Sequence, residues 1–93
     1  MQIYLRLKWV ANPIEEIAEV MKNYPEIVFC VDMVSSAGGH KVDIDELGID
    51  IVITSSQKCL GLPAGMSICT FSQKAIDRAK TVKNRGRYLD LLT

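Results

Sequence analysis

Lys58 is the residue whose sequence context points most directly to chemistry. It ends the polar run Ser55-Ser56-Gln57-Lys58, which follows an apolar, β-branched stretch at residues 49–54. Such a stretch is typical of a buried strand, so the polar run should lie where that strand leaves the sheet. A partly desolvated lysine amine at such a place is a nucleophile toward carbonyl carbons and can form a Schiff base.

A carboxylate, Asp32, follows a second apolar run at residues 27–31. This run is too short for a helix and rich in β-branched residues, so it predicts a central strand. A small-residue loop at 33–40 and one or two helical turns at 42–47, capped by Gly48, separate the two strands. This arrangement is a βαβ-like unit with parallel strands and a right-handed crossover. Asp32 and Lys58 are therefore expected at one edge of the sheet, where ligands bind in open α/β folds.

Ahead of these strands, the sequence predicts an arm and a helix. Residues 2–10 alternate apolar and polar side chains, as an exposed strand or an unpaired arm would. Asn12 is a suitable N-cap and Pro13 a suitable first helical residue, and the apolar spacing that follows predicts an amphipathic helix. The run at 23–25, Asn-Tyr-Pro, should end it.

Behind these strands, residues 66–71 are a third strand candidate. The loop at 59–65 has no room for a crossover helix, so this strand should run antiparallel to the second. Ser72 should cap a final amphipathic helix over residues 73–83. The sequence thus predicts an α/β fold of three-layer type, with a mainly parallel sheet, one antiparallel strand and flanking helices.

Composition narrows the classes of partner. The chain has 93 residues, enough for at most one small domain, and 11 Lys and Arg balance 11 Asp and Glu. This balance gives no field that would draw the chain to nucleic acid or to an anionic membrane, and no apolar run could cross a bilayer. Cys30, Cys59 and Cys69 lack a C-x-x-C pair, which favours reduced thiols and a cytoplasmic location. With His40 as the one histidine, we predict no metal site.

Other motif matches lack the companions that their chemistry needs. Residues 55–58 fit the S-x-x-K motif of penicillin-recognising serine enzymes, but neither S-D-N nor K-T-G occurs in the chain. The acidic run at 43–48 lacks the alternating oxygen ligands of a calcium loop. The glycines at 38–39 and 61–65 belong to no phosphate-binding motif and are predicted to form turns.

The Asp32 and Lys58 pair suits one cofactor in particular. Pyridoxal phosphate needs an amine that forms a Schiff base with its aldehyde and a carboxylate that keeps its pyridine nitrogen protonated. Neighbouring strand ends that carry a lysine and an aspartate supply both groups. A lysine and an aspartate at strand ends are more often solvated surface charges or an ion pair, and the pattern alone leaves both interpretations open.

Three blocks of the sequence, in this order and spacing, closely resemble the class V aminotransferases. They are VDMVSSAGG at 31–39, GID at 48–50 and TSSQKCLGLPAG at 54–65. The likeness extends from about residue 10 to residue 88 and is to the alanine–glyoxylate and serine–pyruvate aminotransferase group. This resemblance implies the large domain of a pyridoxal-phosphate fold type I enzyme.

The resemblance also implies site roles. Lys58 matches the catalytic Schiff-base lysine, which also shuttles protons, and Asp32 matches the partner of the pyridine nitrogen. Val34 matches the side chain packed on the ring face, and Gln57 matches a hydrogen-bond donor near the ring hydroxyl. The structural alternatives are core packing for Val34 and capping of a strand end for Gln57.

Two serines in the same blocks, Ser36 and Ser55, are implied to lie beside the cofactor, with capping as their structural alternative. The implied reaction moves an amino group from a small amino acid, alanine or serine, to a 2-oxo acid, glyoxylate or pyruvate. Family members are dimers, and a strand pair with open edges and an uncovered apolar face should associate. We therefore expect a homo-oligomer or association with a complementary chain.

The chain departs from the family in extent. Residues 1–93 match only part of the large domain, with 1–9 as a divergent amino-terminal arm and 10–88 as the family-like portion. The glycine-rich turn that helps to bind phosphate and the small domain with the substrate-binding arginine are missing. An internal start, a frameshift or a truncation would leave such a break. The alternative function is thus a truncated, non-catalytic α/β remnant that keeps the lysine site, and we expect the isolated chain to be inactive.

Overall fold

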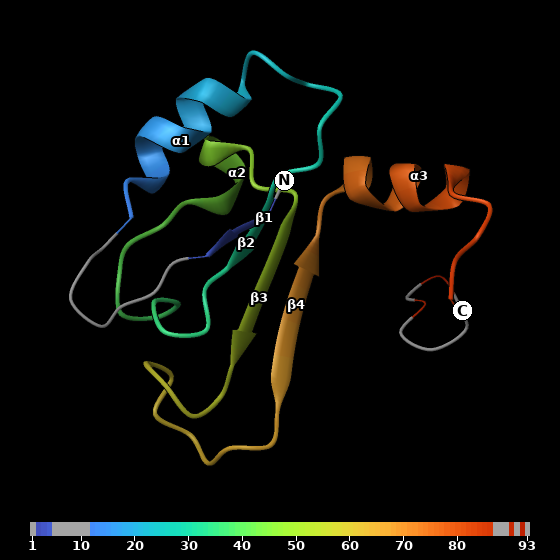
Figure 1. Cartoon of the computed structure of the whole chain (residues 1–93). Helices are drawn as coiled ribbons and strands as arrows, with labels where there is room; N and C mark the ends of the chain where they lie inside the picture. The colour runs from blue at the N-terminus through green and yellow to red at the C-terminus, as the bar shows by residue number, and fades with distance from the viewer. Residues whose placement is uncertain (1, 5–11, 87–89, 91, 93) are drawn as a thin grey trace.

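The computed structural model describes residues 2–4, 12–86, 90 and 92 (Figure 1). Its elements, in chain order, are β1 (Gln2–Tyr4), α1 (Ile14–Met21), β2 (Cys30–Asp32), α2 (Ile44–Leu47), β3 (Ile51–Ser55), β4 (Ser67–Phe71) and α3 (Gln73–Thr81). The strands form one sheet in the order β1-β2-β3-β4. Strands β1, β2 and β3 are parallel, and β4 is antiparallel to β3. The predicted α/β class, with a mainly parallel sheet and one antiparallel strand, is confirmed.

The register aligns the ends of the parallel strands. Asp32, the last residue of β2, pairs with Tyr4 of β1 on one side and with Ile53 of β3 on the other. β3 ends two residues later, at Ser55. The carboxyl ends of these strands therefore lie at one edge of the sheet, as the sequence predicts.

The core lies between α1 and one face of the sheet. Val31 of β2 and Val52 of β3 are paired and almost fully buried. Because side chains alternate along a strand, Asp32 and Ile53 point to the opposite face. The buried apolar cluster comprises Ile14, Ala18, Met21, Phe29, Val31, Met33, Ile49 and Val52.

The far side of the sheet has little cover among the described elements. All five residues of β4 are exposed. Phe71, which pairs with Ile51, and Ile53 share this face of the sheet and are 38% and 40% exposed. Figure 1 shows α3 beyond the end of β4, away from α1 and α2. The apolar side chains of Ile53 and Phe71 are therefore partly open to solvent on this face.

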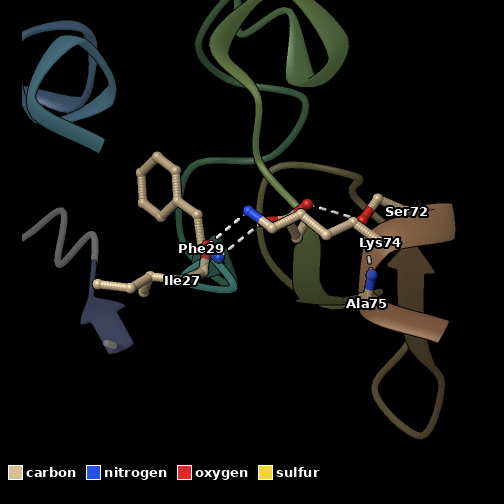
Figure 2. A network of polar contacts seen from close by, with 6 residues as sticks. Ile27, Phe29, Ser72, Lys74 and Ala75 are labelled. Carbon is tan, nitrogen blue, oxygen red and sulfur yellow. Dashed lines mark hydrogen bonds and ion pairs between the residues drawn. The ribbon is translucent and has the colours of Figure 1, made fainter. Parts of the chain in front are cut away.

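A polar network closes the amino end of the sheet (Figure 2). Asp50, which is 6% exposed, accepts hydrogen bonds from the Phe29 amide at 2.8 Å and from the Ser72 hydroxyl at 2.7 Å. Lys74 Nζ lies 3.3 Å from the same carboxylate and donates to the Ile27 carbonyl at 2.6 Å. One carboxylate therefore ties the starts of β2, β3 and α3 together.

The predicted caps of α2 and α3 are confirmed, and the predicted cap of α1 is wrong. Gly48 ends α2 in the left-handed conformation, with φ 69°, and Ser72 caps α3. The prediction of Asn12 as N-cap is wrong, because α1 begins at Ile14 and Pro13 occupies the cap position without a side-chain cap bond. The Ile14 amide instead donates to the Asn12 carbonyl at 2.8 Å, in a tight turn around the proline. Residues 5–10 of the predicted arm lie outside the described residues.

Candidate active site

Two loops leave the carboxyl edge of the sheet and contact each other. One follows β2 at residues 33–40 and the other follows β3 at residues 56–66, and Figure 1 shows both at the same end of the sheet. The Cys59 thiol of the second loop donates to the Ser35 carbonyl of the first at 3.2 Å. A Cβ built on Gly39 would lie 2.6 Å from Cys59 Sγ, so any larger residue at this meeting point of the loops would force the thiol to move.

Asp32 is half-buried and held by its own loop. Its Oδ1 accepts a hydrogen bond from the Val34 amide at 3.0 Å, and Oδ2 has no partner among the described residues. Paired residues share a face, so the Asp32 side chain lies on the same face as Ile53 and as Ser55, two residues further on. The fixed carboxylate can accept a further hydrogen bond there.

The segment that follows Asp32 is fastened to β3. The Met33 amide donates to the Ile53 carbonyl at 2.8 Å, and the buried Thr54 hydroxyl donates to the Met33 carbonyl at 3.2 Å. The Ala37 amide also donates to Met33, at 2.9 Å, and this bond closes the first turn of the loop. The backbone next to Asp32 is therefore fixed relative to the strand that leads to Lys58.

Lys58 and Gln57 lie on the second loop, and both are exposed. Within the described part of the chain, neither side chain forms a hydrogen bond or an ion pair. The sequence leaves open an ion pair between Lys58 and Asp32, but the described residues contain none. The Lys58 amine is thus available to an incoming group.

Two buried hydroxyls at this edge lack partners. Ser36 is 2% exposed, and neither its Oγ nor that of Ser55 has a hydrogen-bond partner among the described residues. Leaving a buried hydroxyl unpaired costs about 1–3 kcal/mol, so such groups are rare in folded proteins. The neighbouring Ser56, 1% exposed, does have a partner, because its hydroxyl donates to the Pro63 carbonyl at 2.6 Å.

Three contributors to this edge are absent from the sequence-based prediction. Ser56, Thr54 and Cys59 hold the two loops but interact with main-chain carbonyls, which carry no signature in a sequence. A run of three hydroxyl residues at the end of a buried strand was the available signal for the first two.

The described residues contain neither a cluster of metal ligands nor a membrane-spanning helix. Among the described residues, no three His, Cys, Asp or Glu side chains gather closely enough to hold a metal ion. No helix in this part of the chain has the length and apolar character needed to span a membrane.

The sequence matches one family across almost its whole length. The sequence model of the class-V aminotransferases matches residues 9–93. An uncharacterized aminotransferase of Methanocaldococcus jannaschii is 49% identical over 82 residues, which are 87% of this chain and 21% of that protein. Alanine–glyoxylate aminotransferase 1 of Saccharomyces cerevisiae is 37% identical over 78 residues, which are 83% of this chain and 20% of the yeast protein.

Solved structures agree with these sequence matches. The crystal structure of an alanine–glyoxylate aminotransferase from Nostoc sp. superposes with a TM-score of 0.80 at 27% identity, over 90% of this chain and 22% of that one. Aspartate aminotransferase from Thermus thermophilus gives a TM-score of 0.81 at 28% identity, over 98% of this chain and 26% of that one. The chain spans about a fifth of the length of the curated relatives it matches.

Proposed function

The chain belongs to the class V aminotransferases, and from that premise we propose that it is the segment of such an enzyme that holds pyridoxal phosphate, the cofactor of the family. The observation that carries the proposal is the meeting of Asp32 and the Lys58 loop at one sheet edge, beside two unpartnered buried hydroxyls. A cofactor with a basic ring nitrogen, an aldehyde and several oxygen acceptors matches this set of groups.

Two residues would carry the chemistry. When bound, pyridoxal phosphate supplies an aldehyde for covalent attachment and a ring that accepts electrons from the substrate carbon. Lys58, whose amine is free of ion pairs within the described chain, would be the attachment point and would move protons at its Nζ. Asp32, fixed through its Oδ1 by the Val34 amide, would hold a protonated ring nitrogen.

Four further residues would bind or orient the cofactor. Val34, half-buried beside Asp32, would pack on the ring, and the exposed Gln57 amide would donate to a ring oxygen. The hydroxyls of Ser36 and Ser55 would donate to cofactor oxygens. Binding would then relieve the cost of leaving these two hydroxyls unpaired.

The reaction that we propose for an enzyme containing this segment is transfer of an amino group from alanine or serine to glyoxylate or pyruvate. It is supported by relatives named alanine–glyoxylate aminotransferase in Saccharomyces cerevisiae and serine–glyoxylate aminotransferase in Arabidopsis thaliana. The 93 residues contain no group that we assign to the substrate carboxylate. Because orientation of the substrate supplies much of the rate, we expect these residues alone to attach the cofactor without transaminating.

The attachment step is tested by borohydride reduction of the chain with pyridoxal phosphate, followed by peptide mass mapping. We expect a pyridoxyl adduct at Lys58 that is lost in Lys58→Ala and kept in Lys83→Ala, a matched change at another exposed lysine. Modification spread evenly over the exposed lysines would overturn the proposal. Alanine–glyoxylate turnover by the isolated chain would contradict the expected lack of activity.

A second candidate function is a non-catalytic α/β segment that keeps the lysine site, and it is compatible with the exposed Lys58, whose side chain has no described polar contact. Cofactor attachment separates the two candidate functions, since a remnant with a disrupted site would show no preference for Lys58.

The exposed apolar residues of β3 and β4 support association with a second copy or a complementary chain. Sedimentation should then show a species larger than the monomer, and a stable monomer would contradict it.

A further inference from the structure

The segment that carries Lys58 is closed on itself by hydrogen bonds. The Ser56 hydroxyl donates to the Pro63 carbonyl at 2.6 Å, and the Leu62 amide donates back to the Ser56 carbonyl at 2.9 Å. Inside this ring the Gly61 amide donates to the Lys58 carbonyl at 3.0 Å. The lysine backbone is therefore the middle of a closed turn whose base is one buried serine.

The same turn is docked onto the loop that follows Asp32. The Cys59 thiol donates to the Ser35 carbonyl at 3.2 Å, and Gly39 leaves room for it, since a Cβ there would lie 2.6 Å from Sγ and 3.3 Å from the Cys59 Cβ. This contact is one residue from Lys58 in one loop and three residues from Asp32 in the other. It links the two proposed chemical groups by a short path.

We propose that Ser56 and Cys59 are positioning residues that set the Lys58 amine relative to the Asp32 carboxylate. The proposal rests on the proposed function. Lys58 has a long side chain that makes no hydrogen bond or ion pair to the described residues, so its amine can be placed only through its backbone. Ser56 fixes the shape of the turn and Cys59 fixes where the turn sits. Errors of about 1 Å in such placement cost catalysis heavily.

The two residues should act in distinguishable ways. In Ser56→Ala the turn loses its base, so hydrogen exchange of the Leu62 amide in the cofactor-free chain should be about tenfold faster. In Cys59→Ala the turn stays closed, and exchange at Leu62 should not change. Thr81→Ala, which removes an exposed hydroxyl bond to a main-chain carbonyl in α3, is the matched control for the serine.

The deciding experiment measures two properties of the full 93-residue chain with pyridoxal phosphate. Borohydride trapping with mass mapping reports attachment at Lys58, and visible circular dichroism of the bound cofactor reports a fixed orientation. We expect both variants to keep attachment and to lose most of the circular dichroism band. Cys59→Ser, which keeps a donor, should restore much of the band, and Cys69→Ala, at another exposed cysteine, should leave it unchanged.

The outcomes separate the inference from the function beneath it. No adduct at Lys58 in the wild-type chain would overturn the proposed function and the inference together. An adduct with a wild-type dichroism band in both variants would overturn the inference alone. Because Cys59 is exposed, its variants test the proposal even if Ser56→Ala does not fold.

Discussion

The two ends of the sheet use the same residue types in opposite ways. At the amino end, an aspartate, a lysine and a serine (Asp50, Lys74 and Ser72) contact one another and the main chain. At the carboxyl end, Asp32 and Lys58 form no ion pair within the described chain, and the serine hydroxyls there include two with no described partner. Polar groups that satisfy one another hold a fold together, whereas unsatisfied ones remain available to a ligand.

The energetic contrast follows from burial and partners. Asp50 is a buried carboxylate that has two hydrogen-bond donors and an ammonium group around it, which offsets its desolvation. Ser36 is buried to a similar degree and gains no such bond from its hydroxyl. The Asp50 network at the amino end therefore adds to the stability of the chain, while the two unpartnered hydroxyls at the carboxyl end subtract from it.

Asp50→Ala should give the largest difference in stability between changes at the two ends of the sheet. Removing this carboxylate leaves the buried Phe29 amide without its partner and unties Ser72, so we expect a loss of about 3 kcal/mol in the free energy of unfolding. The half-exposed Lys74 can return to water and adds little. Urea denaturation measures the change.

Lys58→Ala is the control for this prediction at the other end. Its side chain is exposed and has no described polar contact, so the urea midpoint should stay within about 0.5 kcal/mol of the wild type. Equal losses in Asp50→Ala and Lys58→Ala would contradict the division of the sheet into a stabilising end and a binding end.

A smaller effect of opposite sign is expected at Ser36. Replacing an unpaired buried hydroxyl removes a desolvation cost, so Ser36→Ala should raise the free energy of unfolding by about 1 kcal/mol. The same change should weaken trapping of pyridoxal phosphate at Lys58. Ser56→Ala is the matched variant, since it removes a satisfied hydroxyl and should cost about 1 kcal/mol. Losses of equal size in both serine variants would show that Ser36 has a partner.

The sequence predicts the carboxyl end better than the amino end, for a physical reason. Strand composition and loop length determine where Asp32 and Lys58 emerge, so their common edge follows from the βαβ pattern. Asp50 lies at the start of a buried strand, and its partners include main-chain groups and residues more than 20 positions away. Nothing local in the sequence predicts such contacts.

Local signals also differ in how well they predict helix ends. Ser72 and Gly48 act through their own geometry, a short hydroxyl and a backbone free to adopt positive φ, and both were predicted correctly. Asn12 has an equally good side chain, but the proline after it took the cap position and moved the helix start. All the site residues stay predictions, because no bound cofactor tests their roles: Asp32, Val34, Ser36, Ser55, Gln57 and Lys58.

A substitution at the contact between the two loops should lower the free energy of unfolding modestly. Gly39→Ala would place a Cβ 2.6 Å from Cys59 Sγ, so the thiol must rotate away from Ser35. Because a side-chain end can move more easily than backbone, the loss should be about 0.5–1 kcal/mol by urea denaturation. In a Cys59→Ala background the same substitution should cost close to nothing. Equal losses of stability from Gly39→Ala in the wild type and in Cys59→Ala would show that the clash with Cys59 Sγ is not their cause.

The smallest expected effect is a difference in alkylation rate between two thiols, one at each end of the sheet. Burial raises the pKa of the Cys30 thiol above its ordinary value of 9.0, and the charge of Asp50 acts in the same direction. The protonated form is favoured, so Cys30 should react with iodoacetamide more slowly than the exposed Cys59 of the other end. Alkylation followed by peptide mapping gives the two rates.

The same shift has a definite sign in stability. Because the folded-state pKa of Cys30 lies above the unfolded value, its contribution is fully present below the unfolded pKa and is lost as pH rises through the folded one. The free energy of unfolding should therefore fall as the pH rises above the unfolded pKa of the thiol, and fall less in Cys30→Ala. Asp50→Asn should reduce the difference, because the charge that raises the pKa is removed. An identical pH dependence of stability in the wild type and in Cys30→Ala would show that burial does not raise the pKa of this thiol.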